Sequence, residues 1–338
     1  MRFPFSLSWR LGWYLLRKRF SGQKRFALVL MLEPLHTCNL HCEGCGRIRE
    51  YGGRLEDRLS VAECVAAADE CAAPIVSLCG GEPLLYPELS ELLKRLIAMG
   101  KHIYLCTNGT LLADRLSQLP RNRRIMLNIH LDGMEATHDA LVGRSGAFGL
   151  ALEGIRQAKH AGWFVYTNTT VYRHTDMSEI IVLFTFLTQL GVDGMMLSPA
   201  YGYEAVQTSA PERASAIFLT RQEIQQKFRT AWPMLRRFRV VASPIYLEFL
   251  CGRRQLGCAA WANPTFNRAG WRSPCYLRAD RHYPTYQQLL EQTDWDSVGP
   301  GRDPRCQHCM VHCGFEPAAV LGRKGVRDWL RMAWWQLG

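Results

Sequence analysis

Short β-rich runs alternate with helical stretches over the first two thirds of the chain, and this alternation constrains the fold more than any other feature. The runs are residues 26–32, 73–78, 102–108, 124–133, 163–171 and 194–201. Helical stretches lie between them, at residues 60–72, 87–100, 149–162 and 176–191. Six strand–helix units in series predict a parallel sheet with right-handed crossovers. Six units are too few for a closed eight-stranded barrel, so an α/β fold is expected, as a partial (β/α)6 barrel or a doubly wound sheet.

The predicted strands all end in short segments that suit a binding site. Ser60 and Glu63 form a capping-box pattern at the start of the first long helix, which supports the boundary there. In parallel α/β folds, ligands bind at the carboxyl ends of the strands. The segments at these ends read LEP, CGGEP, CTNGT, LDG, NTT and SPAY. We therefore expect the functional site at this edge of the sheet.

The regular alternation stops near residue 235, and Cys, Trp, Pro and Gly are frequent after it. A chain of 338 residues can form one large domain with a smaller second unit. We expect the barrel at residues 25–235 and a cysteine-rich module at 236–320. Two end segments, 1–24 and 321–338, flank them.

Thirteen cysteines are many for this length, and six of them stand in two tight groups, 38–45 and 306–313. No small-residue cleavage site follows an apolar run near the basic start, so a cleavable export signal is not expected. In the reducing cytosol, tight groups of cysteines are metal sites rather than disulfides. A cytoplasmic, metal-binding protein is therefore expected.

The first cysteine group follows directly on the first predicted strand. Cys38, Cys42 and Cys45 stand as Cys-x3-Cys-x2-Cys, and the next strand is followed by Gly80-Gly81-Glu82-Pro83. Three thiolates can hold three irons of a 4Fe-4S cluster and leave the fourth iron open for chemistry. The alternatives are half of a structural zinc site or buried thiols.

This combination of motifs resembles the radical S-adenosylmethionine (SAM) superfamily. The resemblance implies that the triplet binds a 4Fe-4S cluster whose open iron chelates the amino and carboxylate groups of SAM. It also implies that Gly80, Gly81 and Glu82 hold the SAM amino group, with the glycines allowing close backbone approach. The superfamily often has an aromatic residue just before the third cysteine, where this chain has Gly44.

A narrower resemblance covers residues from about 8 to about 320. The runs LMLEPLHTCNLHCEGCG, YLCTN, HLDG, WANPT, GWRSPCYL, TDWD and CMVHCGFEP resemble the adenosyl-hopene transferase family of hopanoid biosynthesis. In that family a 5′-deoxyadenosyl radical adds to the terminal alkene of diploptene, a hopene, to give adenosylhopane. The resemblance implies an electron donor such as flavodoxin or ferredoxin, and no nucleic-acid partner.

Polar residues at the strand ends are further site candidates, because period-two alternation puts them on one face. The resemblance implies that Asn108, His130, Asn168 and Ser198 bind SAM; the alternative for each is a buried polar residue bonded to a neighbouring loop. Cys106 shares a face with Asn108. We predict that Cys106 is catalytic, since a thiol can give a hydrogen atom to the product radical; Cys79 is a weaker candidate. The alternative for Cys106 is a small buried hydrophobic residue.

The late cysteines form a second candidate metal site. They resemble the shortened auxiliary-cluster modules that follow the barrel in some radical SAM enzymes. Four thiolates, those of Cys258, Cys275, Cys306 and Cys309, would close a second 4Fe-4S site or a structural zinc site, and Cys313 would be spare or replace one of the four.

Both ends of the chain combine tryptophan and leucine with basic residues. Residues 6–20 and 327–338 suit helices lying in the headgroup region of a membrane, and the alternative is packing on the barrel. The longest apolar run, 180–192, is too short to cross a bilayer and predicts a buried helix. The net charge of +11 fits an anionic membrane surface or simple solubility. Peripheral contact with the inner face of the cytoplasmic membrane is therefore a hypothesis.

Two other functions fit parts of the sequence. A radical SAM peptide maturase that abstracts hydrogen would also carry an auxiliary cluster, and it predicts free 5′-deoxyadenosine. A zinc-binding nucleic-acid module would use the basic charge and predicts colourless protein with salt-sensitive binding.

Overall fold

The computed structural model describes residues 3–322 and 325–337. Residues 1–2, 323–324 and 338 of the two predicted end segments lie outside the described residues. One nine-stranded sheet runs through the chain in the order β6-β5-β4-β3-β2-β1-β7-β8-β9. Its strands are β1 Val29–Leu32, β2 Ile75–Leu78, β3 His102–Thr107, β4 Ile125–His130, β5 Phe164–Val171, β6 Gly194–Pro199, β7 Thr265–Asn267, β8 Gly270–Cys275 and β9 Arg278–Tyr283.

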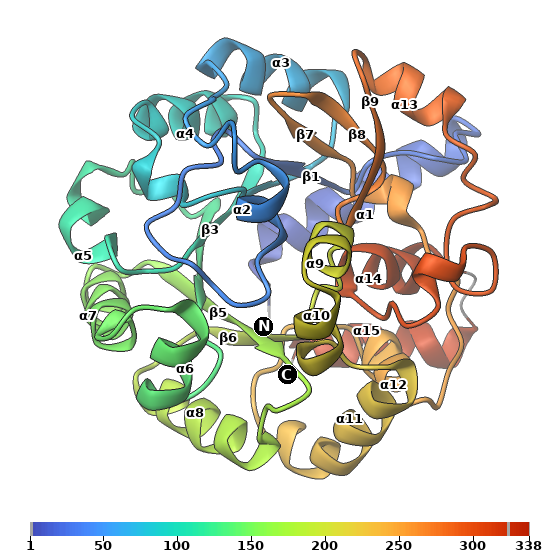
Figure 1. Cartoon of the computed structure of the whole chain (residues 1–338). Coiled ribbons are helices and arrows are strands. Elements are labelled where there is room, and N and C mark those ends of the chain that lie inside the picture. Colours follow the sequence, from blue (N-terminus) through green and yellow to red (C-terminus); the bar gives the residue numbers. More distant parts are fainter. Residues whose placement is uncertain (1–2, 323–324, 338) are drawn as a thin grey trace.

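The first six strands are all parallel and pair in chain order. Helices surround the strands in Figure 1, as expected for a partial barrel. The helices of this part are α1 Phe5–Phe20, α2 Gly46–Glu50, α3 Val61–Glu70, α4 Leu89–Ala98, α5 Leu112–Arg115, α6 Glu135–Val142, α7 Ala147–His160 and α8 Met177–Gln189. The partial (β/α)6 architecture expected from the sequence is confirmed, and the six predicted strands each match an observed one.

Local sequence signals explain the helix ends. Ser60 caps α3 through the Glu63 amide while the Glu63 carboxylate accepts from the Ser60 amide, so the predicted capping box is present. On α8 only one face is buried, through Ile180, Leu183 and Phe184. The prediction of a buried helix at 180–192 therefore holds for one face. None of the helices among the described residues is long and apolar enough to cross a membrane.

The chain after β6 extends the same sheet. Strand β7 pairs with β1 in parallel, and β8 and β9 follow as antiparallel neighbours. These three strands are the orange arrows near β1 in Figure 1. The helices of this part are α9 Glu204–Ser209, α10 Pro211–Ile217, α11 Arg221–Leu235, α12 Pro244–Leu250, α13 Tyr286–Gln292, α14 His312–Leu321 and α15 Val326–Leu337. The cysteine-rich segment is thus joined to the barrel by main-chain hydrogen bonds.

The sheet has two differently filled faces. Residues that point outward, such as Leu30, Val76 and Leu105, are fully buried against the helices. Residues that alternate with them on the inner face, such as Tyr104, Cys106 and Met196, remain partly exposed. The core therefore lies between sheet and helices, and the inner face is left for a site.

Candidate functional site

The cysteine triplet lies in the loop after β1, where the sequence predicts it. Cys38 and Cys42 pack against Leu40, Val142 and Ala147. Backbone hydrogen bonds from residues 41 and 43 to the end of α6 hold the loop in place. Burial raises the pKa of Cys38 to about 11, and the nearby Cys45 adds to the effect. The same two causes raise the pKa of Cys42, which shows that the three thiols are neighbours.

Gly44 provides room for an aromatic ring from another part of the chain. A Cβ at this position would lie 2.9 Å from the ring of Tyr172, which follows β5. Tyr172 thus occupies the space that a side chain at position 44 would need. The sequence pattern could not reveal this partner, because it comes from a distant strand end.

The two glycines of the second motif pack against the triplet loop. Gly80 has a φ of +102°, and a Cβ there would lie 2.5 Å from the Leu35 carbonyl oxygen. The Gly81 amide donates to that same oxygen at 3.0 Å, and a Cβ on Gly81 would overlap the Thr37 carbonyl. Both glycines therefore allow the backbone of this loop to approach the backbone before Cys38 closely. That they also allow close approach to the SAM amino group stays a prediction.

Glu82 is fully buried and receives three hydrogen bonds. Its carboxylate accepts from the Thr107 hydroxyl at 2.7 Å, the Asn108 amide at 2.8 Å and the Leu84 amide at 2.9 Å. Burial raises the pKa of Glu82, and these donors oppose the effect. The carboxylate thus joins the glycine loop to the end of β3. A direct contact between Glu82 and an ammonium group stays a prediction.

Asn108 lies beside the first cysteine. Its side-chain amide donates to Asn39 at 2.8 Å and lies 3.9 Å from the Cys38 sulfur. Its carbonyl oxygen accepts from the backbone amide and the hydroxyl of Thr110. Asn39 and Thr110, which the sequence reasoning did not select, complete this bracing of the triplet loop.

Cys106 lies on the inner face of the sheet, as predicted. Its sulfur is 3.3 Å from the Ser77 hydroxyl on β2 and 3.6 Å from the side-chain amide of Asn128 on β4. Burial raises the pKa of this thiol, so it is protonated at neutral pH. A protonated thiol still carries the hydrogen atom that the predicted role requires.

His130 is paired with a buried carboxylate. Its Nε2 lies 2.7 Å from Asp132, whose other oxygen accepts from the Thr170 amide at 2.7 Å. Burial alone would lower the pKa of His130, but Asp132 outweighs it and raises the pKa. Asp132 also raises the pKa of Cys42, so the pair lies near the triplet. Strand alternation placed Asp132 on the same face as His130, but only His130 was selected as a site residue.

The remaining strand-end candidates differ in what they face. Asn168, which pairs with His130 across the sheet, has a buried side-chain oxygen without a hydrogen-bond partner, and so does Asn128. Buried amide oxygens normally have partners, so these two can accept hydrogen bonds from a ligand. Ser198 instead lies 3.3 Å from the His312 ring and contacts Tyr246. Asn168 therefore joins Asn128 as a residue with a free hydrogen-bond acceptor, whereas the Ser198 hydroxyl already has partners.

The residues around the triplet fit a cluster with a bound SAM. Among the described residues, no three His, Cys, Asp or Glu side chains converge closely enough to hold a single metal ion. A 4Fe-4S cluster asks for a different arrangement, because each thiolate binds its own iron. The neighbouring thiols supply three ligands, and the oxygens of Asn128 and Asn168, which have no hydrogen-bond partner, lie on the adjacent strands β4 and β5.

The five late cysteines line one small cavity of about 30 Å³. They come from the loop before β7, the end of β8 and the segment before and within α14. The cavity lining includes Cys258, Cys275, Cys306, Cys309 and Cys313. Burial and the neighbouring thiols raise the pKa of Cys258 and of Cys313. The chain thus gathers more thiols than the four that a closed cluster or a zinc ion needs.

Two glycines make this gathering possible. A Cβ on Gly314 would lie 2.5 Å from the Cys258 sulfur, and one on Gly299 would lie 3.1 Å from the Cys258 Cβ. Gly299 also has a φ of +117°, which favours glycine. Both positions therefore keep space for the thiol, as a metal ligand set requires.

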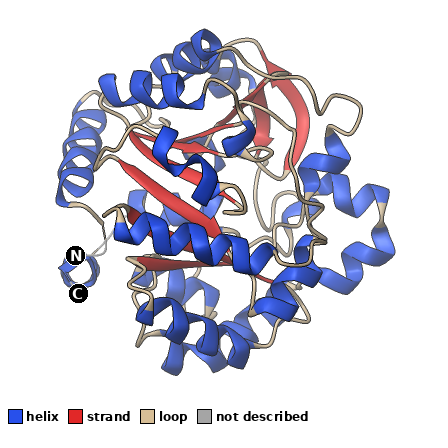
Figure 2. Cartoon of the chain, turned by 90° about the vertical axis from the view of Figure 1, so that its left-hand side faces the viewer, coloured by secondary structure: helices blue, strands red, loops and turns tan. Residues whose placement is uncertain are grey.

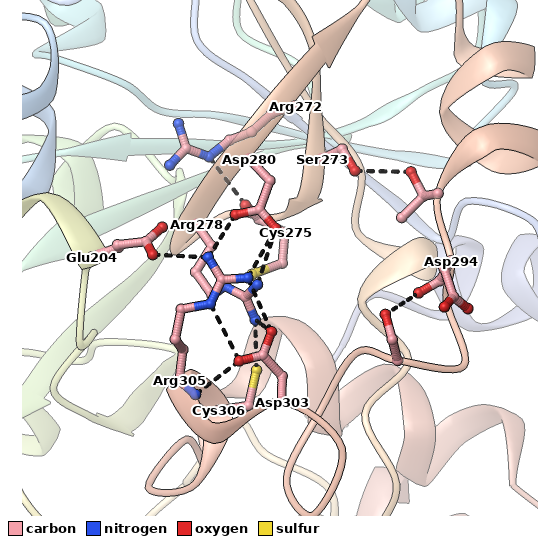
Figure 3. Close-up of polar contacts among 12 residues, drawn as sticks. Glu204, Arg272, Ser273, Cys275, Arg278, Asp280, Asp294, Asp303, Arg305 and Cys306 are labelled. Carbon is pink, nitrogen blue, oxygen red and sulfur yellow. Dashed lines mark hydrogen bonds and ion pairs between the residues drawn. The ribbon is translucent and has the colours of Figure 1, made fainter.

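A buried arginine contacts one of the thiols. Figure 3 shows Arg278 beside Cys306, with a distance of 3.1 Å between guanidinium and sulfur. Arg278 also forms ion pairs with Asp303 at 2.7 Å and Asp280 at 3.1 Å. Arg278 thus places a positive charge next to the thiol cluster. Arg305 joins Asp280 to Glu204 at the start of α9 and so ties this segment to the barrel.

An aromatic cluster separates the two cysteine sites. The rings of Tyr201, Tyr203 and Tyr276 lie 5.7–6.1 Å apart, and the Tyr201 hydroxyl lies 3.1 Å from His312. Cys79 hydrogen-bonds Tyr276, and Cys106 packs against the same cluster. The sequence reasoning missed these rings, because they come from two segments that meet only in the fold.

This arrangement defines a class of protein: a partial barrel with three neighbouring thiols at the first strand end and a polar ligand set beside them. Residues 32–187 match the sequence model of the radical SAM superfamily. The barrel part of the chain therefore belongs to the radical SAM superfamily, whose members use a 4Fe-4S cluster and SAM. Residues 195–331 match a domain of unknown function, DUF3463.

Curated relatives resemble the barrel region. The chain is 34% identical over 159 residues to the AdoMet-dependent heme synthase of Methanosarcina barkeri, covering 46% of this chain and 45% of that protein. It is 32% identical over 173 residues to the GTP 3′,8-cyclase of Aquifex aeolicus, covering 48% and 54%. The chain thus spans about half the length of the curated relatives it matches.

Solved structures share the fold. The Streptococcus suis protein SuiB bound to its precursor peptide SuiA superposes with a TM-score of 0.62 at 14% identity, covering 89% of this chain and 73% of that chain. The structure of anSMEcpe with bound AdoMet gives a TM-score of 0.54 at 14% identity, covering 91% and 96%. At this identity the likeness supports the fold alone.

Proposed function

We propose that the protein is a radical SAM adenosyl transferase that forms a carbon–carbon bond between SAM-derived adenosine and the alkene of a hopene such as diploptene. The observation that carries the proposal is the Cys106 thiol on the inner face, between Ser77 and Asn128 and next to the polar strand ends. The narrower sequence resemblance supports the choice of a hopene. The product would be adenosylhopane, and the pathway hopanoid biosynthesis, a branch of lipid metabolism.

The bound cluster and SAM supply a 5′-deoxyadenosyl radical when an electron donor such as flavodoxin or ferredoxin provides one electron. Cys38, Cys42 and Cys45 would hold the cluster. Asn128 and Asn168 would accept hydrogen bonds from the ligand, and Asn108 keeps the triplet loop in position. His130, set in place by Asp132, presents a polar ring at the same end of the barrel.

Cys106 would complete the reaction. Addition forms a bond between C5′ of the adenosine and the terminal alkene carbon, and the neighbouring carbon keeps the unpaired electron. Cys106 gives its hydrogen atom to that carbon, so its S–H bond breaks and a C–H bond forms. One electron from the same class of donor and one proton from solvent then restore the thiol.

Anaerobic turnover with SAM, reductant and diploptene, followed by mass spectrometry, tests the proposal. We expect adenosylhopane from the wild type. The Cys106→Ala variant should still cleave SAM but should lose at least ~10-fold in reduced product, with Cys64→Ala, a buried thiol on α3, as the matched control. Equal product from Cys106→Ala would refute the role of this thiol.

Other outcomes separate the competing functions. If the only products are 5′-deoxyadenosine and methionine, the protein is a radical SAM enzyme but a hopene is not its substrate. A peptide maturase predicts this result. A colourless preparation with zinc and no iron would favour a zinc-binding nucleic-acid module. Brown anaerobic protein containing iron and sulfide would reject that module.

A further inference from the structure

Exposed apolar side chains gather on the two end helices. Of the thirteen large hydrophobic residues that are exposed among the described residues, ten belong to α1 or α15. They are Phe5, Trp9, Trp13, Leu16 and Phe20 on α1, and Val326, Trp329, Leu330, Trp334 and Leu337 on α15. Scattered single residues of this kind are normal on a protein surface, but a concentration of ten on two helices indicates an interaction surface.

The two helices are neighbours, although they come from opposite ends of the chain. The Gln336 side chain donates to the Phe3 carbonyl at 3.0 Å and to the Ser8 hydroxyl at 2.8 Å. The rings of Phe3 and Trp335 lie 5.6 Å apart. Both ends of the chain lie together in Figure 2 as well. We call the combined exposed surface of α1 and α15 the end-helix face.

The opposite side of α1 already has its partner. Leu7 is buried against Ile75, Met126, Tyr166 and Val241, at the amino ends of the barrel strands. The alternative that α1 packs on the barrel is therefore correct for this side of the helix. The exposed residues Trp9 and Trp13 lie on the other side, so burial of α1 on the barrel does not cover them.

The charge on the end-helix face indicates what covers it. Helix α1 contains no acidic residue, and its Arg17 and Arg19 are exposed. Its other two cations, Arg10 and Lys18, are half-buried on the side of the barrel. Arg327 adds a further exposed cation at the start of α15. Tryptophans next to basic residues suit the boundary between headgroups and acyl chains, and each Lys or Arg near an anionic surface contributes about 1 kcal/mol.

We propose that the end-helix face docks on a bilayer containing anionic phospholipid, so that the amino ends of the barrel strands face the membrane and the cysteine triplet faces away from it. This orientation follows from the position of Leu7 at the amino ends and of Cys38 at the opposite, carboxyl ends. The docking itself needs no assumption about the reaction.

The orientation has a consequence that rests on the proposed function. Between α1 and Cys106, the inner face of the sheet carries an apolar layer that includes Tyr104, Met126 and Met196. A lipid alkene leaving the membrane would meet this layer before it reached the thiol. The first turn of α1, which covers the layer through Leu7, would have to move aside.

Vesicle co-sedimentation of the full anaerobic protein tests the docking without any turnover. We expect binding to vesicles of phosphatidylcholine mixed with phosphatidylglycerol, and weak binding to pure phosphatidylcholine. Trp9→Glu/Trp13→Glu should lower binding at least ~10-fold, because it removes apolar contact and adds charge. The matched control is Leu150→Glu/Val182→Glu, which changes two exposed apolar residues on α7 and α8 and should bind as the wild type does.

Two results would overturn the docking. One is equal vesicle binding by wild type and Trp9→Glu/Trp13→Glu. The other is a dimer, detected by light scattering, that dissociates in Trp9→Glu/Trp13→Glu and stays intact when vesicles are added. The end-helix face would then bind a second copy of the chain instead of a membrane. Vesicle binding without any adenosylated alkene would leave the docking standing and refute the proposed function instead.

The entry route has its own test. Met196→Trp enlarges a partly exposed side chain on the inner face and should reduce alkene adduct at least ~10-fold while SAM cleavage and vesicle binding persist. Val182→Trp, on the exposed face of α8, is the control. Unchanged adduct from Met196→Trp would refute the route, whatever the docking result.

Discussion

The second cysteine site makes a quantitative prediction at Gly314. This residue lies in the first turns of α14, and a Cβ there would lie 2.5 Å from the Cys258 sulfur. A sulfur held by a metal centre has no freedom to move aside. Gly314→Ala should therefore expel Cys258 from the ligand set or strain the helix that carries Cys313.

Two opposing effects set the magnitude. Replacing a helical glycine by alanine gains about 1 kcal/mol from helix propensity. Inserting a methyl group into a packed site costs about 1–3 kcal/mol. The variant should thus be less stable than the wild type by about 0–2 kcal/mol, which is small enough for it to fold. Its metal content should change far more than its stability.

Iron, sulfide and zinc analysis after anaerobic reconstitution provides the assay. We expect about eight irons per chain in the wild type and about four in Gly314→Ala, because the triplet site is untouched. The control is Gly149→Ala on α7, where a Cβ meets no atom within 4 Å. Full iron content in Gly314→Ala would refute the assignment of Cys258, and about four irons plus zinc in the wild type would identify the second site as zinc.

Three further predictions concern the barrel. Arg47→Met should lower the free energy of unfolding, measured with denaturant, by about 3–5 kcal/mol, because it leaves the buried Glu33 carboxylate without its cation. Burial favours the neutral form of Glu33, but Arg47 and His36 hold its pKa at about 2. A lowered carboxylate pKa stabilises the folded protein only at pH values where the carboxylate is ionised. The loss should therefore shrink as the pH falls and Glu33 becomes protonated, and an equal loss at all pH values would contradict the ion pair. Asp132→Asn should lower the pKa of His130 and shift any His130-dependent arm of the pH–rate profile to lower pH; an unshifted profile would show that His130 does not titrate in turnover. Replacing Cys38, Cys42 and Cys45 together by alanine should remove about half of the iron and all SAM cleavage, and SAM cleavage that persists would place the reactive cluster elsewhere.

The sequence was sufficient wherever a pattern is local. Short β-rich runs between helical stretches located the six parallel strands, and Ser60 with Glu63 fixed the start of α3. The spacing of Cys38, Cys42 and Cys45 identified the thiol triplet, because ligands on one loop are fixed by that loop alone. Cys106 was assigned to the inner face by alternation, and its contacts with Ser77 and Asn128 agree.

Only the tertiary structure decided which distant groups meet. Tyr172 fills the space at Gly44, the glycine loop packs on the triplet loop, and Ser198 faces His312. The two end helices form one surface because Gln336 of α15 bonds to the chain at Phe3 and Ser8. These contacts depend on crossovers and strand order, which bring together residues far apart along the chain. A local pattern carries no information about such partners, so the sequence determined the elements and the triplet, while the fold determined their surroundings.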